Sequence, residues 1–237
     1  TKWLPESAQP ILDRYEGLSD NAWENDLVIW PEAAITVPYL RALPYLRAMG
    51  NKTEGALILG IPLVEIGSDD GYVHRNAAVV VGDGSGHYIK RKLVPFGEFV
   101  PFERVLRGVI TFVDLPMSTT REGPKRQPLV AAMGLKVAIA ICYEVVYARM
   151  VAAAAAKADF IVDFSNDTWF GRSIGPAQHL LIARMRALEI CRFLLRGTNN
   201  GVTAIIAPNG GVVSQLPQFE AVSYTHLRAH ETLRYLV

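Results

Sequence analysis

The chain has 237 residues and a formal net charge of +1, with 50% of its residues apolar and 20% charged. This composition is typical of a globular α/β protein of one large or two small domains. The near-zero charge gives no reason to expect binding to nucleic acid. Two cysteines cannot form a disulfide framework. No stretch of about 20 residues is apolar enough to span a bilayer, and the chain begins with Thr1 rather than methionine, so we expect it to be cut from a longer protein.

Helical and strand patterns alternate along the first half of the chain. The patterns predict a helix over 10–18, a strand over 26–30, a helix over 38–49 that stops at Gly50-Asn51, and a buried strand over 56–60. Two further runs are typical of a hairpin around a glycine-rich turn: 76–81, 87–92 and the turn 82–86. The proline-rich stretch 93–128 is a long connection, and such connections are usually functional.

The second half continues in the same way. It predicts a strand over 135–142, a helix over 145–156, a strand over 159–164, a long helix over 176–194 and a closing hairpin of 196–207 with 211–214. Because hairpins intervene between strand–helix units, the pattern favours two sheets in an α/β layered protein over one parallel sheet. The pattern is coherent over residues 1–222 and is lost over 223–237.

Cys142 is the strongest candidate for a chemical role. It ends the apolar run 134–141, and the polar residues Tyr143 and Glu144 follow at once. A cysteine in this place lies at the carboxyl end of a strand, near a helix N-terminus that favours the thiolate. A lone cysteine is more often a small buried hydrophobe, but polar residues next to a core strand need a reason. Cys191, on the long helix, is expected to lie in the core.

Two charged residues also follow apolar strands. Glu32 comes after a strand and a proline, and Lys90 stands in a basic run with Lys92. Glu32 would ordinarily be a carboxylate that caps a helix, and its chemical role would be that of a general base. Lys90 would ordinarily lie on a solvated face, and its chemical role would be that of a cation that stabilises an oxyanion. Strand periodicity cannot choose between the two lysines. Glu144 would either orient the lysine or share a proton with Glu32. Together with the thiol of Cys142, these groups would form an acyl-transfer site.

Glu98 lies in the apolar, proline-rich loop 94–101. A carboxylate in such surroundings is costly unless it is paired, and Lys90 and Arg104 are the candidate partners. Phe96 and the apolar side chains around it either line a hydrophobic entrance or form a small satellite core under the loop.

The sequence predicts neither a metal site nor a cofactor. The histidines at 74, 87 and 179 are dispersed, and the cysteines lack the paired spacing of metal ligands. The glycine-rich segment 82–86 lacks the strand–turn–helix context of a phosphate or dinucleotide motif.

The candidate residues resemble the Glu-Lys-Cys triad of the nitrilase, or carbon–nitrogen hydrolase, superfamily; they are Trp30-Pro31-Glu32, Lys90 and Cys142-Tyr143-Glu144. Longer blocks narrow the resemblance to the apolipoprotein N-acyltransferase family: residues 92–101, 165–171, 175–189 and 198–204. The similarity covers roughly residues 2–222, and several of these blocks are specific to that branch.

The resemblance implies a nitrilase-like α-β-β-α four-layer sandwich. It also implies a transferase of the bacterial inner membrane, with its catalytic domain on the periplasmic side and the membrane reached through flanking helices. The donor would be a phospholipid, whose fatty acyl chain forms a thioester with the cysteine. The acceptor would be the N-terminal amine of diacylglyceryl-cysteine in an apolipoprotein.

By the same resemblance, Glu32 would be the general base, Lys90 the oxyanion stabiliser and Cys142 the nucleophile. Glu98, Tyr143 and Glu144 would be supporting residues of the site. Trp3, Phe96 and Phe170 would lie at the lipid entrance.

The chain also departs from the family pattern. The family has membrane-spanning helices before and after this domain, and this chain has neither. It begins after the family's first sheet strand, which would leave an unpaired edge or a gap. Residues 223–237 are either a solvated terminal helix or, on the interpretation we favour, foreign sequence in place of the segment that leads to the last span. We therefore expect poor stability and little activity on membrane lipid from this chain alone.

Two alternatives remain at this point. A soluble nitrilase-type amidase would use the same triad to hydrolyse small amides or nitriles, with water as the acceptor. A non-enzymatic module would keep the fold and lose the chemistry. The phenylalanine-rich loop and the long helix blocks favour the acyltransferase over the first, and the intact triad argues against the second.

Overall fold

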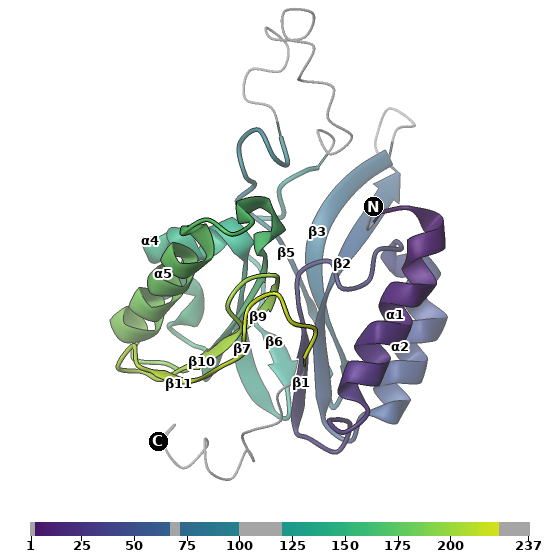
Figure 1. The fold of residues 1–237 in the computed structure, drawn as a ribbon, viewed down its shortest axis with the longest axis horizontal. Helices are drawn as coiled ribbons and strands as arrows, with labels where there is room; N and C mark the ends of the chain where they lie inside the picture. The colour runs from purple at the N-terminus through teal and green to yellow at the C-terminus, as the bar shows by residue number, and fades with distance from the viewer. Residues whose placement is uncertain (1–2, 67–71, 100–119, 223–237) are drawn as a thin grey trace, which may run out of the picture.

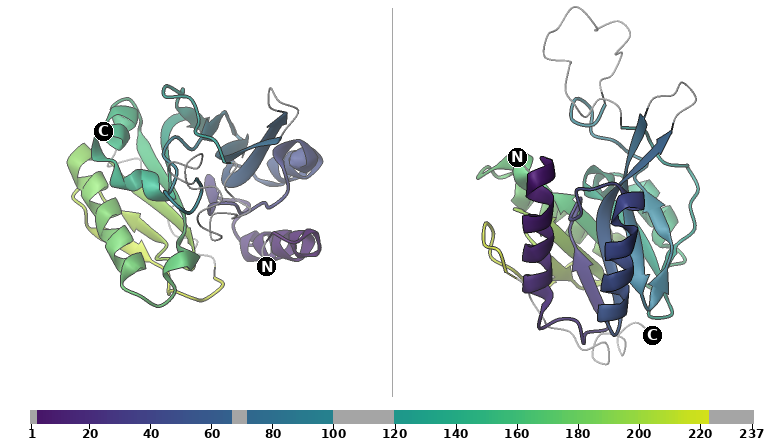
Figure 2. Two further views of the ribbon diagram at one scale, coloured as in Figure 1. Left: turned by 90° about the horizontal axis from the view of Figure 1, so that it is seen from above. Right: turned by 90° about the vertical axis from the view of Figure 1, so that its right-hand side faces the viewer.

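The computed structural model describes residues 3–66, 72–99 and 120–222. Two β-sheets pack face to face in it, and a pair of helices covers the outer side of each sheet (Figures 1 and 2). This arrangement is the predicted four-layer α-β-β-α sandwich. The expected tail 223–237, Arg104 and most of the expected functional loop lie outside the described residues.

The first sheet has the strand order β1-β2-β3-β5. Its strands are β1 (Leu27–Trp30), β2 (Ala56–Ile66), β3 (Tyr72–Gly82) and β5 (His87–Ile89). β1 runs parallel to β2 and is joined to it through α2 (Tyr39–Lys52), whereas the other pairs are antiparallel. Helix α1 (Pro5–Ser19) precedes β1 and lies beside α2 on the outer side of this sheet (Figure 1).

The second sheet has the order β11-β10-β9-β8-β7-β6-β4. Its strands are β4 (Gly84–Ser85), β6 (Val130–Ala132), β7 (Leu135–Ile141), β8 (Phe160–Asn166), β9 (Leu194–Asn199), β10 (Ala204–Ile206) and β11 (Val212–Gln215). Its outer face is covered by α4 (Ala148–Ala155) and α5 (Gly175–Ile190) (Figure 1). Two short 3₁₀ helices, η2 (Cys142–Val146) and η3 (Asp167–Phe170), follow β7 and β8 directly.

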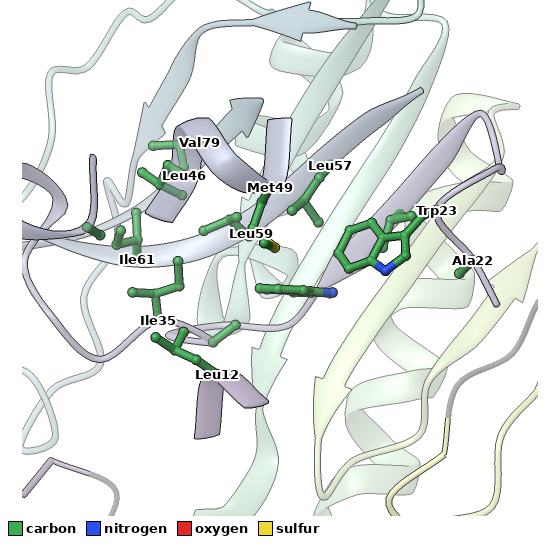
Figure 3. Close-up of a cluster of buried hydrophobic side chains, with 14 residues drawn as sticks. Leu12, Ala22, Trp23, Ile35, Leu46, Met49, Leu57, Leu59, Ile61 and Val79 are labelled. Atoms are coloured by element: carbon green, nitrogen blue, oxygen red, sulfur yellow. The ribbon is translucent and has the colours of Figure 1, made fainter. Parts of the chain in front are cut away.

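Alternation along the strands divides the apolar residues between three cores. In β2, Leu57 and Leu59 point toward the helices, where they pack with residues such as Met49 (Figure 3). Ala56 and Ile58 point the other way, into the core between the two sheets. A third core lies under α4 and α5. Because β2 is covered on both faces, its sequence is a continuous apolar run rather than an alternating one.

The structure corrects several predicted boundaries. Helix α1 starts five residues earlier than predicted and continues through Pro10, and α2 continues through Gly50. The segment predicted as a closing hairpin is a three-stranded antiparallel unit of β9, β10 and β11. Helix α5 ends at Ile190 because Cys191 has a left-handed backbone (φ 52°). For the same reason the prediction that Cys191 lies in the core was wrong: its side chain is exposed.

The glycine-rich turn does more than close a hairpin. β3 and β5 pair antiparallel as predicted, but β4 between them leaves the first sheet and pairs with β6 of the second. Gly84 permits this close approach, because a Cβ there would lie 2.5 Å from the carbonyl oxygen of Ala131. The turn therefore ties the two sheets together beside the strand that leads to Lys90.

Within the described ranges, none of the helices combines the length and the apolar character needed to cross a bilayer.

Candidate active site

The candidate residues lie where strands of both sheets end. Glu32 is the second residue after β1 of the first sheet, Lys90 directly follows β5 of the same sheet, and Cys142 directly follows β7 of the second. Cys142 has a left-handed backbone (φ 54°) and is the first residue of η2. The sandwich thus brings three segments that are distant in sequence to one place between its two sheets.

Lys90 is buried between two carboxylates. Its Nζ lies 3.3 Å from Oε1 of Glu32 and 2.9 Å from Oε2 of Glu98, and only 1% of its side chain is exposed. Asn76 joins the cluster by donating from Nδ2 to Glu32 Oε1 over 2.6 Å. A buried charge must be paired to be tolerated, and here each charged group has a partner. The structure thus places Lys90, and not Lys92, between the carboxylates; Lys92 lies over the ring of Tyr147 instead.

The carboxylates keep Lys90 charged. Burial by itself would lower the pKa of Lys90, but the negative charges of Glu32, of a Cys142 thiolate and of Glu98 outweigh it and raise that pKa above its usual value. Lys90 is therefore a permanent ammonium group at neutral pH, suited to stabilise a negative charge that forms beside it.

The environment of Cys142 keeps its sulfur protonated. Burial, reinforced by the negative charge of Glu32, raises the pKa of the Cys142 thiol to about 12, although the charge of Lys90 acts in the opposite direction. The expectation that a helix N-terminus favours the thiolate was therefore wrong. Desolvation by the surrounding protein outweighs any such effect of the short helix η2. A reaction at this sulfur needs a base to remove its proton.

Glu144 holds the two chain segments of the site together. Its carboxylate is fully buried and accepts hydrogen bonds from the hydroxyl of Tyr88 and from the backbone N–H groups of Arg91, Lys92 and Ile141. These bonds join the residues after Lys90 to the residue before Cys142. Burial raises the pKa of Glu144, and the backbone hydrogen bonds partly offset this effect. This geometry fits the expectation that Glu144 orients the lysine, but Glu144 contacts the backbone that follows Lys90 rather than its Nζ.

Three asparagines support Glu32, and the sequence analysis did not select any of them as site residues. Besides the bond from Asn76, the backbone N–H of Asn166 donates to Glu32 Oε2 over 2.7 Å. Asn199 donates from Nδ2 to the carbonyl oxygen of Glu32 over 2.8 Å and accepts from the hydroxyl of Tyr15. Asn166 and Asn199 lie in two of the sequence blocks that carried the family resemblance, so these blocks could have indicated them. Asn76 lies inside a strand, and no sequence pattern indicated it as a site residue.

The structure does not gather the three expected entrance residues into one cavity. Trp3, Phe96 and Phe170 are all exposed. Trp3 lines a cavity whose described lining includes neither of the other two. Phe170 packs edge-on against His179, with 6.2 Å between ring centroids. Tyr143, expected as a supporting residue, is partly buried and packs edge-on against Tyr147.

The cavity that Trp3 lines has a volume of about 940 Å³ and lies beside the site rather than in it. Its walls are α1 and the edge of β1 on one side and β9, β10 and β11 on the other. It reaches the site at Asn166 and Asn199. Among the described residues, β1 pairs only with β2, so the other edge of β1 faces this cavity.

A second buried cluster of charges lies behind Cys142. Arg196 of β9 bonds to Asp163 and, over 3.0 Å, to Oδ2 of Asp167. Burial raises the pKa of Asp163 despite the charge of Arg196. Burial opposes ionisation of Asp167 too, but the hydrogen bond from His179 and the charge of Arg196 outweigh it and lower the pKa of Asp167. This cluster was not predicted from the sequence, although Asp163 inside an apolar strand was a usable signal.

No group of three or more histidine, cysteine, aspartate or glutamate residues in the described ranges is arranged to hold a metal ion.

Among known families, the sequence matches the one described as carbon-nitrogen hydrolase, over residues 3–234. The chain is also similar to curated proteins named apolipoprotein N-acyltransferase. It is 49% identical to the one from Pseudomonas aeruginosa over 222 residues, which is 92% of this chain and 43% of that protein. It is 41% identical to the one from Vibrio cholerae over 232 residues, 92% of this chain and 45% of that protein. The chain thus spans less than half the length of these relatives.

Solved structures share the fold at low sequence identity. The NitFhit protein of C. elegans superposes with a TM-score of 0.69 at 15% identity, over 89% of this chain and 55% of that one. An amidase of the nitrilase superfamily from Nesterenkonia superposes with a TM-score of 0.65 at 18% identity, over 91% of this chain and 82% of that one. The fold, the site at the strand ends and the match over nearly the whole chain agree: this chain belongs to the carbon–nitrogen hydrolase family.

Proposed function

We propose that this chain is the catalytic part of an N-acyltransferase that moves a fatty acyl chain from a phospholipid to the N-terminal amine of diacylglyceryl-cysteine in apolipoproteins. The observation that carries the proposal is the buried ammonium of Lys90, which is held between Glu32 and Glu98 and whose charge acts on the ionisation of the Cys142 thiol. The relatives that are 41–49% identical to the chain bear the name of this activity. The whole enzyme would act at the bacterial inner membrane, with this part on the periplasmic side.

In the first half-reaction, Cys142 attacks the carbonyl carbon of the phospholipid ester. Because the thiol is protonated at neutral pH, Glu32 takes its proton as the carbon–sulfur bond forms. The negative charge that develops on the carbonyl oxygen is stabilised by the ammonium of Lys90. The carbon–oxygen ester bond then breaks, and Glu32 returns the proton to the alkoxide of the departing lysophospholipid. The acyl chain remains on Cys142 as a thioester.

In the second half-reaction, the amine of the acceptor attacks the thioester carbon. Glu32 accepts a proton from the amine, and Lys90 again stabilises the oxyanion. When the carbon–sulfur bond breaks, Glu32 passes the proton to the departing sulfur and an amide remains on the acceptor. Splitting one exchange into two steps on a cysteine lowers the barrier of each.

The exposed aromatic side chains of Trp3, Phe96 and Phe170 suit contact with lipid, because aromatic rings are favoured where apolar and aqueous surroundings meet. We keep them as candidate entrance residues on this ground. Glu98 keeps its supporting role as the second partner of Lys90, and Tyr143 keeps one as the neighbour of the nucleophile.

The cavity beside β1 supports the expectation that a strand precedes α1. Helix α2 joins two parallel neighbours, β1 and β2, in a strand–helix–strand unit. A strand before α1, joined to β1 in the same way, would lie along the free edge of β1, since such crossovers place parallel strands side by side with one handedness. The cavity offers about 940 Å³ at that edge. The catalytic domain would then consist of that strand and residues 1–222.

The test is to search for a thioester on Cys142. The chain is mixed with phospholipid vesicles and analysed by mass spectrometry, with Cys142→Ala as the negative control and Cys191→Ser as the control for the other, exposed cysteine. Because little activity on membrane lipid is expected from this chain alone, we expect a fatty-acyl adduct on a small fraction of Cys142. This adduct disappears when a diacylglyceryl-cysteine peptide is added. Turnover of short amides without any fatty adduct would instead establish the amidase alternative.

A further inference from the structure

His179 is a buried histidine that has no role in the reaction described above. It lies on the face of α5 that packs against η2, the short helix that begins with Cys142. Its Nε2 lies 3.2 Å from the carbonyl oxygen of Cys142. Because a carbonyl oxygen can only accept, Nε2 carries the hydrogen and His179 is the donor.

Arg186 extends this contact along the same helix face. It lies seven residues, or about two turns, after His179, and its Nη1 is 3.5 Å from the carbonyl oxygen of Val145 and 3.4 Å from that of Val146. The carbonyl groups at the C-terminal end of so short a helix lack partners within it. Helix α5 supplies donors at both ends of η2, with His179 at the end that holds the sulfur.

The backbone of Cys142 needs such support. Its φ of 54° lies in the left-handed region, which costs a residue other than glycine about 1–2 kcal/mol. A conformation of this kind persists only where the surroundings hold it. If the carbonyl of Cys142 lost its donor, the peptide could rotate toward the right-handed region, and the sulfur would move away from Lys90.

The other side of the imidazole ring is also fixed. His179 Nδ1 lies 2.9 Å from Oδ1 of Asp167 and 3.0 Å from Nη2 of Arg196. Asp167, which accepts from Nδ1, orients the ring so that Nε2 points at the carbonyl of Cys142; Arg196, which can only donate, holds Asp167 in place from its other oxygen. A histidine whose second nitrogen is held by a carboxylate is a common device for fixing ring orientation.

Asp167 also connects to the sulfur of the same cysteine. Its Oδ1 accepts from the hydroxyl of Ser165 over 2.5 Å, which leaves the Ser165 oxygen to accept from the protonated sulfur of Cys142. The side chain and the backbone carbonyl of Cys142 are therefore both tied, through Ser165 and His179, to one carboxylate.

We propose that His179 is a positioning residue, which holds Cys142 in its left-handed conformation by donating from Nε2 to the Cys142 carbonyl oxygen. This inference rests on the proposed function only in taking Cys142 as the nucleophile. His179 touches neither the acyl group nor the sulfur, so its effect passes through the backbone of Cys142.

Two amide substitutions distinguish the contact made by Nε2 from the contact made by Nδ1. In His179→Gln the side-chain amide reaches the place of Nε2 and can still donate to the Cys142 carbonyl. In His179→Asn the shorter amide reaches only the place of Nδ1, so it keeps the contact with Asp167 and loses the carbonyl. His179→Leu removes both contacts, and His87→Leu, at an exposed histidine of β5, serves as the matched control.

The measured quantity is the rate at which iodoacetamide alkylates Cys142 at alkaline pH, followed by mass spectrometry of the labelled peptides. Cys191 provides an internal reference, because it caps the same helix that carries His179 and is exposed. General damage to α5 would change the labelling of Cys191, whereas a change in the positioning of Cys142 would not. Iodoacetamide needs no lipid, so this result is independent of whether a fatty-acyl adduct forms.

We expect His179→Asn and His179→Leu to alkylate Cys142 about tenfold more slowly, the effect of losing one hydrogen bond of ordinary strength. His179→Gln should stay within about threefold of the parent chain, and Cys191 should label equally in all of them. Equal Cys142 rates in the Asn and Gln variants would overturn the proposal, whether both are fast or both slow. If His179→Leu does not fold, the comparison of His179→Asn with His179→Gln still tests the proposal, because both variants keep a polar side chain.

Discussion

The ammonium nitrogen of Lys90 lies 3.3 Å from the carboxylate of Glu32, although 58 residues separate them along the chain. Lys90 is almost completely buried and Glu32 nearly so. This contact couples the proposed oxyanion stabiliser to the proposed base. A change at either residue is therefore expected to affect both the stability of the domain and the ionisation of Cys142.

Replacing Lys90 with methionine should abolish acyl transfer and destabilise the chain. The substitution leaves the carboxylates of Glu32 and Glu98 facing each other without a cation, and breaking a buried pair costs about 3–5 kcal/mol. Thermal or urea unfolding measures the stability, and the Cys142 thioester measures the activity. Lys92→Met is the matched control, because Lys92 lies two residues away over the ring of Tyr147.

A double variant tests the cause of that instability. Adding Glu98→Gln to Lys90→Met removes one of the two carboxylates, so part of the lost stability should return while the activity stays absent. Equal stability of the single and double variants would contradict the charge argument.

Replacing Glu32 with glutamine should slow acyl transfer by about a hundredfold or more, because a positioned general base contributes at least that much. It should also lower the pKa of the Cys142 thiol from about 12, because the negative charge of Glu32 is the second contribution, after burial, that raises it. The pH dependence of alkylation at Cys142 measures this shift. If Cys142 in the Glu32→Gln variant ionises more easily but transfers acyl groups more slowly, the role of Glu32 as a base is distinct from its electrostatic effect on the thiol. Glu24→Gln, at an exposed carboxylate, should change neither quantity.

The stability of the chain should fall as the pH rises through the alkaline range, and Cys142 should contribute to the fall. Burial and the charge of Glu32 raise the pKa of its thiol to about 12 in the folded chain, against an ordinary value near 9. Between these values the folded chain retains a proton that the unfolded chain has lost, so the free energy of unfolding decreases with pH.

Urea unfolding at a series of pH values measures this slope. Cys142→Ala should unfold with a shallower slope between about pH 9 and pH 12 than the parent chain. Tyr15, whose pKa burial raises to about 12, contributes with the same sign and is present in both chains, so its effect cancels in the comparison. Parallel curves for the two chains would argue against a protonated thiol.

A longer chain that carries an apolar strand before α1 should be more stable than the chain as it stands. The strand would pair with the free edge of β1 and fill the cavity of about 940 Å³. Backbone hydrogen bonds to β1 and burial of apolar side chains would both increase the free energy of unfolding. Thermal unfolding measures the gain. A version with proline in the middle of the added strand is the control, since proline cannot donate to the sheet. An equal gain from both versions would exclude strand pairing as the reason.

Much of the chemistry could be read from local sequence. Each of Glu32, Lys90 and Cys142 follows an apolar run, and a polar group at the end of a buried strand needs a partner or a function. Two sheets in an α/β layered protein were also accessible, because alternation of strands and helices with hairpins between them has few packing solutions; the four-layer order came from the family resemblance. The boundaries were less accessible: proline at position 10 and glycine at position 50 lie inside helices because tertiary packing overrides local preference.

The tertiary structure alone decided how these groups act on one another. Strand periodicity left Lys90 and Lys92 equivalent, and only the packing of the two sheets placed Lys90 between two carboxylates. The ionisation of Cys142 was misjudged from sequence, because desolvation depends on every residue packed around the sulfur and not on its neighbours in the chain. The contact from His179 to the Cys142 carbonyl has the same origin. Sequence spacing indicates which residues are chemically able to react, whereas burial and three-dimensional contacts determine their charge and orientation.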